Sequence, residues 1–115
     1  MPGKFELKRA KNLEVYFNLK AANGEVILTS EMYKSMKGAL NGIASVKRNS
    51  ALDARFEKKS TKTGKPFFVL KAGNHQVIGQ SESYASEAAR DAGIASVQKT
   101  AGSAAVSDLT KYLTK

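Results

Sequence analysis

The stretch Gly42-Ile43-Ala44-Ser45-Val46 recurs unchanged as Gly93-Ile94-Ala95-Ser96-Val97, an offset of 51 residues from position 42 to position 93. The same offset aligns the two halves of the chain without a gap over about forty-five residues. Further pairs at this offset are Phe5-Glu6 with Phe56-Glu57, Leu19-Lys20-Ala21 with Leu70-Lys71-Ala72, and Tyr33 with Tyr84. Such a fixed period indicates a tandem duplication. We expect a single domain, residues 1–115, with internal repeats at 4–50 and 55–101 and a C-terminal tail at 102–115.

Each repeat has three strand patterns followed by one helical pattern. In the first repeat, alternation of apolar and polar residues predicts strands near residues 5–9, 14–21 and 25–29. The second repeat follows the same plan. Pro66 has no amide hydrogen to donate, so it belongs at a strand start or at an edge.

Turn residues separate these strands. Asn23-Gly24 is typical of a two-residue type I′ hairpin turn, which requires positive φ at both positions. Gly73-Asn74-His75-Gln76 replaces that pair in the second repeat and predicts a looser turn. Leu13 lies in the first hairpin turn, where glycine would fit a turn conformation with less strain. The equivalent residue in the second repeat is such a glycine, Gly64.

The helical patterns begin after Ser35 and Ser86, whose hydroxyls are suited to N-capping. The expected core stripes are Met36, Leu40, Ile43 and Val46 in the first helix, and Ala89, Arg90, Ile94 and Val97 in the second. A glycine inside a helix costs about 1 kcal/mol against alanine. Because both copies contain one, at Gly42 and Gly93, we expect close backbone contact there with the sheet or with the other helix.

One repeat is too small to bury its apolar sheet face alone, so the two should pair around a pseudo-twofold axis. The fold predicted is α+β: two tandem β-β-β-α repeats that share one curved, mainly antiparallel sheet, like a half-barrel, with two packed helices. We expect a monomer with this internal symmetry. The tail could form a last strand around Val106 to Leu109, a short helix or a frayed end.

Composition excludes several classes of protein. The chain has 42% apolar and 25% charged residues, which is ordinary for a folded domain and argues against disorder. It has no cysteine, which excludes disulfides, thiolate nucleophiles and zinc ribbons. Neither a signal peptide nor a membrane-length apolar segment is recognised, so we expect a cytoplasmic protein with no membrane partner. The net charge of +9 is shared by both halves and predicts a basic folded surface.

The residues also resemble a known family. Asn18 to Ile27, followed by Ser30-Glu31-Met32-Tyr33 and Gly42 to Val46, is similar to the YegP-like family of small bacterial tandem-repeat proteins, and the second repeat matches again. The resemblance covers residues from about 4 to about 100. It implies β-β-β-α units in one sheet curved like a half-barrel. It implies almost nothing about activity, since the family has no catalytic motif to transfer.

Side chains with catalytic or ligand-binding chemistry are few. His75, the single histidine, lies in a predicted turn, where histidine is most often a solvated side chain. The repeated motif Ser-Glu-x-Tyr-x-Ser gives a weak ligand-binding set, Glu31, Tyr33, Glu82 and Tyr84. Its glutamates could act as a carboxylate pair only if they face each other across a cleft. Capping and turn roles explain most of the motif. No catalytic residue, metal site or cofactor is predicted.

Basic clusters fall at equivalent hairpins of the two repeats. A candidate nucleic-acid-binding set combines them with two aromatic residues at equivalent strand positions: Lys8, Arg9, Lys11, Lys58, Lys59, Lys62, Lys65, Tyr16 and Phe67. Open aromatic rings among lysines would suit single-stranded nucleic acid. Lysine-rich hairpins also protect sheet edges and increase solubility, and a curved sheet could bury both rings.

Three functions remain open, and the partner is unknown. A non-catalytic module that binds another protein ranks first, because the sequence shows a small repeat domain without site chemistry. A binder of single-stranded nucleic acid or another polyanion is the alternative. A small-ligand protein or an enzyme comes third and would need a deep pocket with convergent polar groups.

Overall fold

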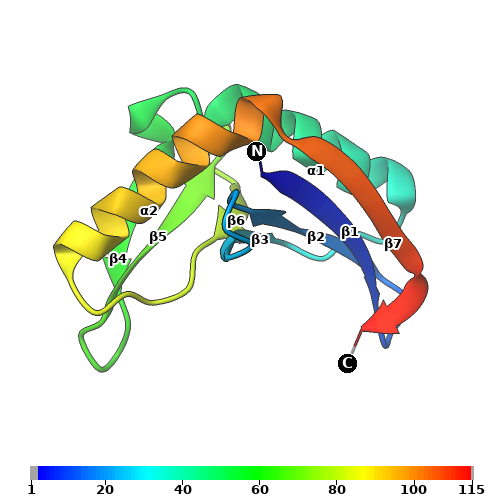
Figure 1. Ribbon diagram of the computed structural model, residues 1–115, viewed down its shortest axis with the longest axis horizontal. Coiled ribbons are helices and arrows are strands. Elements are labelled where there is room, and N and C mark those ends of the chain that lie inside the picture. Colours follow the sequence, from blue (N-terminus) through cyan, green and yellow to red (C-terminus); the bar gives the residue numbers. More distant parts are fainter. Residues whose placement is uncertain (1–2, 115) are drawn as a thin grey trace.

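The computed structural model describes residues 3–114 and shows the predicted duplication (Figure 1). The first repeat forms β1 (Lys4–Ala10), β2 (Val15–Lys20), β3 (Val26–Ser30) and α1 (Met36–Asn49). The second forms β4 (Phe56–Ser60), β5 (Pro66–Lys71), β6 (Val77–Gln80) and α2 (Glu87–Thr100). Short 3₁₀ turns, Asp53–Arg55 and Ala101–Ser103, precede β4 and the final strand β7 (Ala105–Thr114). The tail therefore contains a strand, one of the three structures expected for it.

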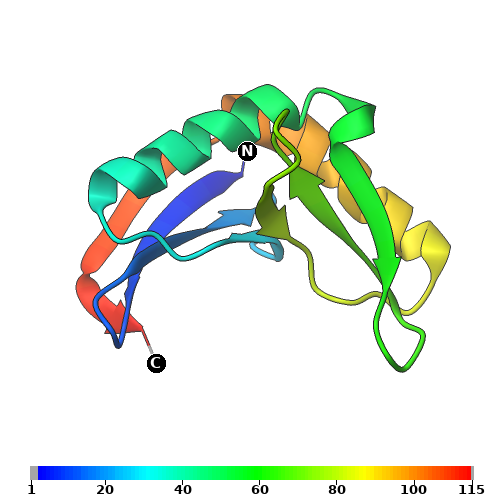
Figure 2. The same ribbon diagram turned by 180° about the vertical axis from the view of Figure 1, so that it is seen from behind.

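All strands described join one sheet in the order β4-β5-β6-β3-β2-β1-β7. The repeats meet at the centre, where β3 and β6 pair antiparallel through Thr29 with Gln80 and Ser30 with Gly79. The remaining pairs are also antiparallel, apart from β7 with β1, which is parallel. The sheet arches, and both helices lie on its convex side, as the two opposite views show (Figure 1, Figure 2). The predicted α+β fold is confirmed.

The core lies between the convex face and the helices and repeats with the sequence. Phe17 contacts Phe5 edge-on at 5.7 Å between ring centroids and stacks on Tyr33 at 6.2 Å. The second repeat reproduces this with Phe68 against Phe56 and Tyr84. The stripe expected on the first helix was wrong at Leu40, which is exposed, because the buried face of α1 is shifted toward Ala39 and Gly42.

The helix glycines accommodate a tyrosine in each repeat. A Cβ on Gly42 would overlap the Tyr33 hydroxyl, and a Cβ on Gly93 would overlap that of Tyr84. The predicted close contact with the sheet is found, since a Cβ at these glycines would lie 3.1 Å from Phe17 and 3.3 Å from Phe68, but the nearer neighbour in each repeat is a tyrosine that was not expected there. Ser35 and Ser86 cap the helices as predicted, since their hydroxyls accept from the amides of Gly38 and Ala89.

Four hairpins share one loop geometry. In each, the residue before the loop makes two backbone hydrogen bonds. Its carbonyl oxygen accepts from the amide of the residue three positions later, and its amide donates to the carbonyl of the residue four positions later. The residues with positive φ at the third loop position are Leu13 (71°), Gly24 (86°), Gly64 (84°) and His75 (71°). This is a three-residue loop with one left-handed position. The type I′ turn expected at Asn23-Gly24 was therefore wrong, as was the looser turn expected at His75, because a non-glycine residue adopts the left-handed position.

Candidate binding surfaces

The two repeats differ most at the outer edges of the sheet. By the repeat offset, β1 in the first repeat is equivalent to β4 in the second, and Phe5 is equivalent to Phe56. On β1, residues Lys4–Ala10 pair with β2 on one side and with β7 on the other. Within residues 3–114, β4 pairs only with β5. The outer edge of β4 is thus left open where the equivalent edge of β1 is covered, and it presents unpaired backbone groups.

A groove runs beside this open edge, between β4 and α2. It has a volume of about 410 Å³ and an apolar part formed by Phe56, Ile94 and Ala95. Phe56 and Ile94 are only partly buried, whereas their first-repeat equivalents Phe5 and Ile43 are 0% and 4% exposed. The second repeat therefore exposes apolar surface that the first repeat encloses.

Polar and charged side chains line the groove around its apolar part. Lys58 and Arg90 approach the same Asp91 carboxylate at 3.3 and 3.1 Å. Gln98 donates to the Asp53 carboxylate at 2.6 Å. Desolvation alone would raise the pKa of Asp91, but hydrogen bonds and charge from Arg90 and Lys58 outweigh it and lower that pKa. The groove thus has an apolar centre and a paired ionic rim.

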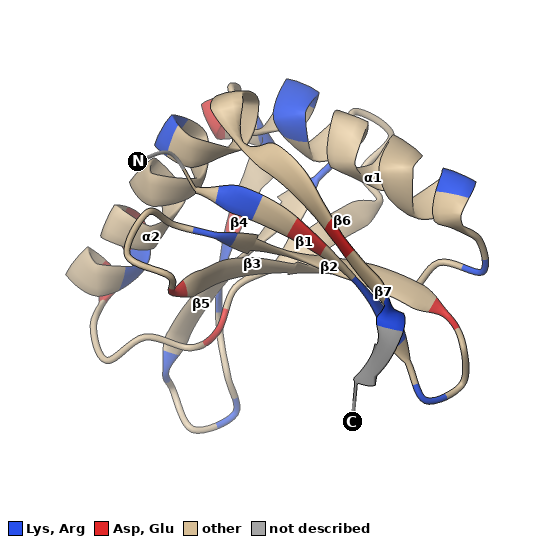
Figure 3. Cartoon of the chain, turned by 45° about the vertical axis from the view of Figure 1, so that its right-hand side comes forward, with Lys and Arg blue, Asp and Glu red and all other residues tan. Residues whose placement is uncertain are grey.

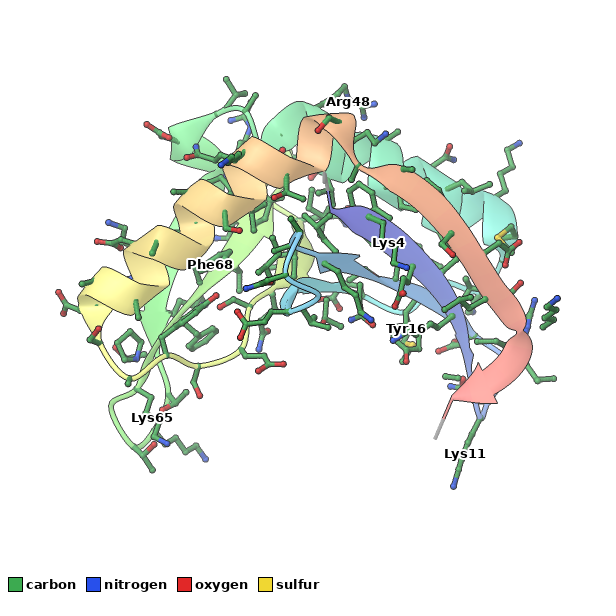
Figure 4. All side chains as sticks on the ribbon, in the orientation of Figure 1. Lys4, Lys11, Tyr16, Arg48, Lys65 and Phe68 are labelled. Atoms are coloured by element: carbon green, nitrogen blue, oxygen red, sulfur yellow. The ribbon has the colours of Figure 1, made fainter. Side chains whose placement is uncertain are left out.

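The concave face of the sheet carries a second candidate surface. Tyr16 lies there, because it alternates with the core residues Val15 and Phe17, and Phe67 occupies the equivalent position on β5. Both rings are partly buried. The basic hairpin tips lie at opposite ends of this face, with Lys11 on one and Lys65 on the other (Figure 3, Figure 4). Both aromatic rings therefore lie on the side to which the two tips extend.

Glu6 forms the charged centre of the first repeat's concave face. It is 6% exposed and lies 3.1 Å from Lys20, 3.4 Å from Lys4 and 3.7 Å from Lys8. Burial on its own would raise the pKa of Glu6. Hydrogen bonds from Lys20 and Lys4 and the charges of Lys20 and Lys8 have the opposite effect and outweigh burial, so the pKa is lowered. In the second repeat Glu57 pairs with Lys71. Much of the positive charge on this face is therefore paired.

The proposed nucleic-acid set is divided between several environments. Lys59 lies on the concave side, opposite Phe67, but Lys58 lies on the helix side, opposite Phe68. Arg9 donates to the carbonyls of Leu13 and Thr110 and so fastens the first hairpin and β7. Lys11, Lys62 and Lys65 are exposed at the hairpin tips. The structure brings part of the set to one face and places Lys58 and Arg9 elsewhere.

The weak ligand-binding set does not form one pocket. Glu31 and Glu82 line one shallow hollow of about 280 Å³, beside the pairing of β3 with β6. Tyr33 together with Glu31, and Tyr84 together with Glu82, line two other hollows. Burial, reinforced by Glu31 beside Tyr33 and by Glu82 beside Tyr84, raises the pKa of each tyrosine. The two tyrosines are partly buried and pack against the core, and the four side chains do not converge on one pocket.

The described part of the chain has neither a metal-binding cluster nor a membrane-spanning helix. Residues 3–114 contain no cluster of three or more histidine, cysteine, aspartate or glutamate side chains arranged to hold a metal ion. Among the same residues, no helix has the length and apolar character needed to cross a membrane. His75 is exposed in its turn.

Comparison with known proteins identifies the family. The model of the domain of unknown function DUF1508 matches twice, at residues 10–57 and 62–108, so the chain belongs to this family and carries the domain in tandem. More specifically, it is a member of the UPF0339, or YegP-like, group, as the sequence resemblance predicted. The function of this domain is unknown.

Bacterial relatives cover nearly the whole chain. A UPF0339 protein of Acinetobacter baylyi is 56% identical over 96% of this chain and 99% of its own length. UPF0339 protein YegP of Yersinia pestis is 56% identical over 94% of this chain and 96% of its own length. The solution structure of yegP from E. coli, a protein of unknown function, has 49% identity and a TM-score of 0.92, with 97% of both chains covered. That of a Shewanella oneidensis UPF0339 protein has 51% identity and a TM-score of 0.90, over 96% of this chain and 94% of that chain.

Sequence reasoning missed the β4 edge and its groove. The edge depends on which strands are outermost, and the parallel pairing of β7 with β1 joins segments about a hundred residues apart, which no local pattern records. The available signal was the tail itself. It has no counterpart after the first repeat, so it could cover only one of the two equivalent edges.

Proposed function

We propose that the protein is a non-catalytic interaction module that binds an extended segment of another protein by strand addition at the edge of β4. One observation carries the proposal: among residues 3–114, β4 lacks the outer neighbour that its equivalent, β1, has in β7. Strand addition uses main-chain hydrogen bonds for affinity and adjacent pockets for side-chain selection. The groove lined by Phe56, Ile94 and Ala95 provides such a pocket.

The test uses a strand that this sheet already accepts. A synthetic peptide with the sequence of residues 104–111 is titrated into the full-length, isotope-labelled protein, and backbone amide shifts and amide exchange are recorded. We expect shifts in Phe56–Ser60 and at Ile94, with slower exchange along β4 because new hydrogen bonds form. Absence of shifts, or shifts confined to β1, where the peptide would displace β7, would overturn the proposal.

A matched pair of variants tests the location. Ala95→Glu places a bulky charge in the groove and should abolish the shifts in β4, since Ala95 lines the groove. Ala44→Glu makes the same change at the equivalent exposed position of the first repeat and should leave binding unchanged. Equal binding by the two variants would show that the groove is not the site.

The concave face supports a second candidate, binding of single-stranded nucleic acid. The favouring observation is that the basic hairpin tips flank the face that carries Tyr16 and Phe67 (Figure 4). Aromatic rings and lysines together suit stacked bases and phosphates. Titration with short single-stranded RNA and DNA at low salt and at about 0.2 M separates this from general attraction, which weakens steeply with salt. Shifts that are diffuse and erased by salt would reject it.

A further inference from the structure

The open edge of β4 has two chemically different ends. At the start of the strand, Phe56 and Ile94 give an apolar contact surface. At its other end, β4 runs into the β4–β5 hairpin, which has Lys59, Lys62 and Lys65. A strand added to this edge would therefore meet an apolar environment at one end and a basic one at the other.

β7 on β1 provides an internal template for such a strand. It runs parallel to β1, with Val106 beside Phe5 and Asp108 beside Leu7. By the repeat offset, Phe5 is equivalent to Phe56 and Leu7 is equivalent to Lys58. A strand in the same register on β4 would place an apolar residue beside Phe56 and, two residues later, an acidic residue beside Lys58.

We propose that the partner segment is an acidic strand that runs parallel to β4, with an apolar side chain against Phe56 and Ile94 and carboxylates that follow it toward the Lys62–Lys65 hairpin. This inference rests on the proposed strand addition and specifies its ligand. The parallel direction follows from β7 on β1, and the order of apolar and acidic residues follows from the two ends of β4.

The charges near the edge determine which lysines attract the ligand. Lys58 is already paired with Asp91 at 3.3 Å, so a ligand carboxylate would share it. Lys59, Lys62 and Lys65 are exposed and outnumber the one acid of the strand, Glu57, which Lys71 engages. The positive charge available to a partner therefore lies at the hairpin end. Three exposed ion pairs of ordinary strength correspond to about a tenfold gain in affinity at low salt.

The direct test compares three peptides by titration of the full-length protein: AVSDLEE, its amide form AVSNLQQ and the reversed sequence EELDSVA. We expect AVSDLEE to bind at β4 about tenfold more tightly than either of the others, and the difference to shrink at about 0.15 M salt, where screening is stronger. Equal affinity of the amide form would overturn the acidic ligand while leaving strand addition in place. Failure of all three to shift β4 would refute strand addition itself.

Direction is measured separately. A spin label at the C-terminus of AVSDLEE should broaden the amide signals of residues 61–65 if the strand is parallel. Broadening of residues 53–55 instead would show an antiparallel strand and overturn the inference. The variant Lys62→Ala/Lys65→Ala should weaken AVSDLEE several-fold but not AVSNLQQ, because it removes charge only. The matched control is Lys11→Ala, the first-repeat equivalent of the Lys62 change, which should leave binding unchanged.

Discussion

Leu13 holds the left-handed position of its hairpin loop, where φ is 71° and the side chain is 60% exposed. A residue with a Cβ is destabilised by about 1–2 kcal/mol in this conformation. Replacement by glycine removes this strain, but part of the benefit is lost because the unfolded chain has greater entropy with glycine. We predict that Leu13→Gly raises the free energy of unfolding by up to about 1 kcal/mol. Thermal melting measures this. The reverse change at the equivalent loop, Gly64→Leu, should lower the melting temperature; an unaltered or lower value for Leu13→Gly would contradict the prediction.

Glu6 makes stability depend on pH. Its folded-state pKa lies below the ordinary value of 4.5, so the carboxylate stabilises the fold at neutral pH, and this contribution disappears as the pH falls through the folded pKa. We predict that Glu6→Gln costs about 1–3 kcal/mol at neutral pH. The difference from the wild-type protein should narrow below pH 4.5.

Denaturant unfolding at a series of pH values measures this difference. Glu57→Gln provides the comparison at the equivalent position. The Glu57 side chain is 44% exposed against 7% for Glu6, so we expect a smaller effect that added salt reduces further. A constant gap between wild type and Glu6→Gln at all pH values would show that the carboxylate acts by packing alone.

At the scale of the element, each helix contains a glycine whose missing side chain leaves room for a tyrosine. We predict that Gly42→Ala and Gly93→Ala each destabilise by about 1–3 kcal/mol, although alanine favours helix, because the new methyl group overlaps Tyr33 or Tyr84. Gly102→Ala, where nothing lies within 4 Å, is the control and should be neutral or stabilising. Denaturant unfolding gives the three values. Equal gains at all three glycines would show that the helices move away without strain.

The elements also show which features local sequence can predict. Strands and capped helices followed from periodicity and from Ser35 and Ser86, since these signals act within a few residues. The displaced stripe at Leu40 did not, because packing on the sheet selects the buried face of α1. The left-handed His75 did not either, because glycine was expected at such a position and the loop geometry places a histidine there. Leu28 shows the same limit: its side chain lies 2.7 Å from where a Cβ of its equivalent, Gly79, would be. The repeat axis has room for only one of the two side chains.

At the scale of the molecule, the repeats share one sheet and one core. A single repeat would expose the apolar face that its partner covers, so we predict that residues 1–52 or 53–115 alone are unfolded or dimeric. Circular dichroism and sedimentation equilibrium distinguish these outcomes. A half that is stable as a monomer would contradict the shared-sheet arrangement. The duplication made this architecture predictable from sequence, whereas the candidate site was not, because it depends on β7, which covers the edge of β1 and leaves that of β4 open at the opposite end of the sheet.

The position of β7 also makes the two ends of the sheet unlike. A sheet with two equivalent open edges could accept the same strand at each end, and copies joined through both could grow into an open filament. Here β7 covers the edge of β1 and is itself the outer strand at that end, so among the strands described the two outer edges belong to β4 and β7. A strand suited to β4 would therefore meet a different edge at the far end of the sheet. The extra tail after the second repeat thus gives a symmetric duplication a direction.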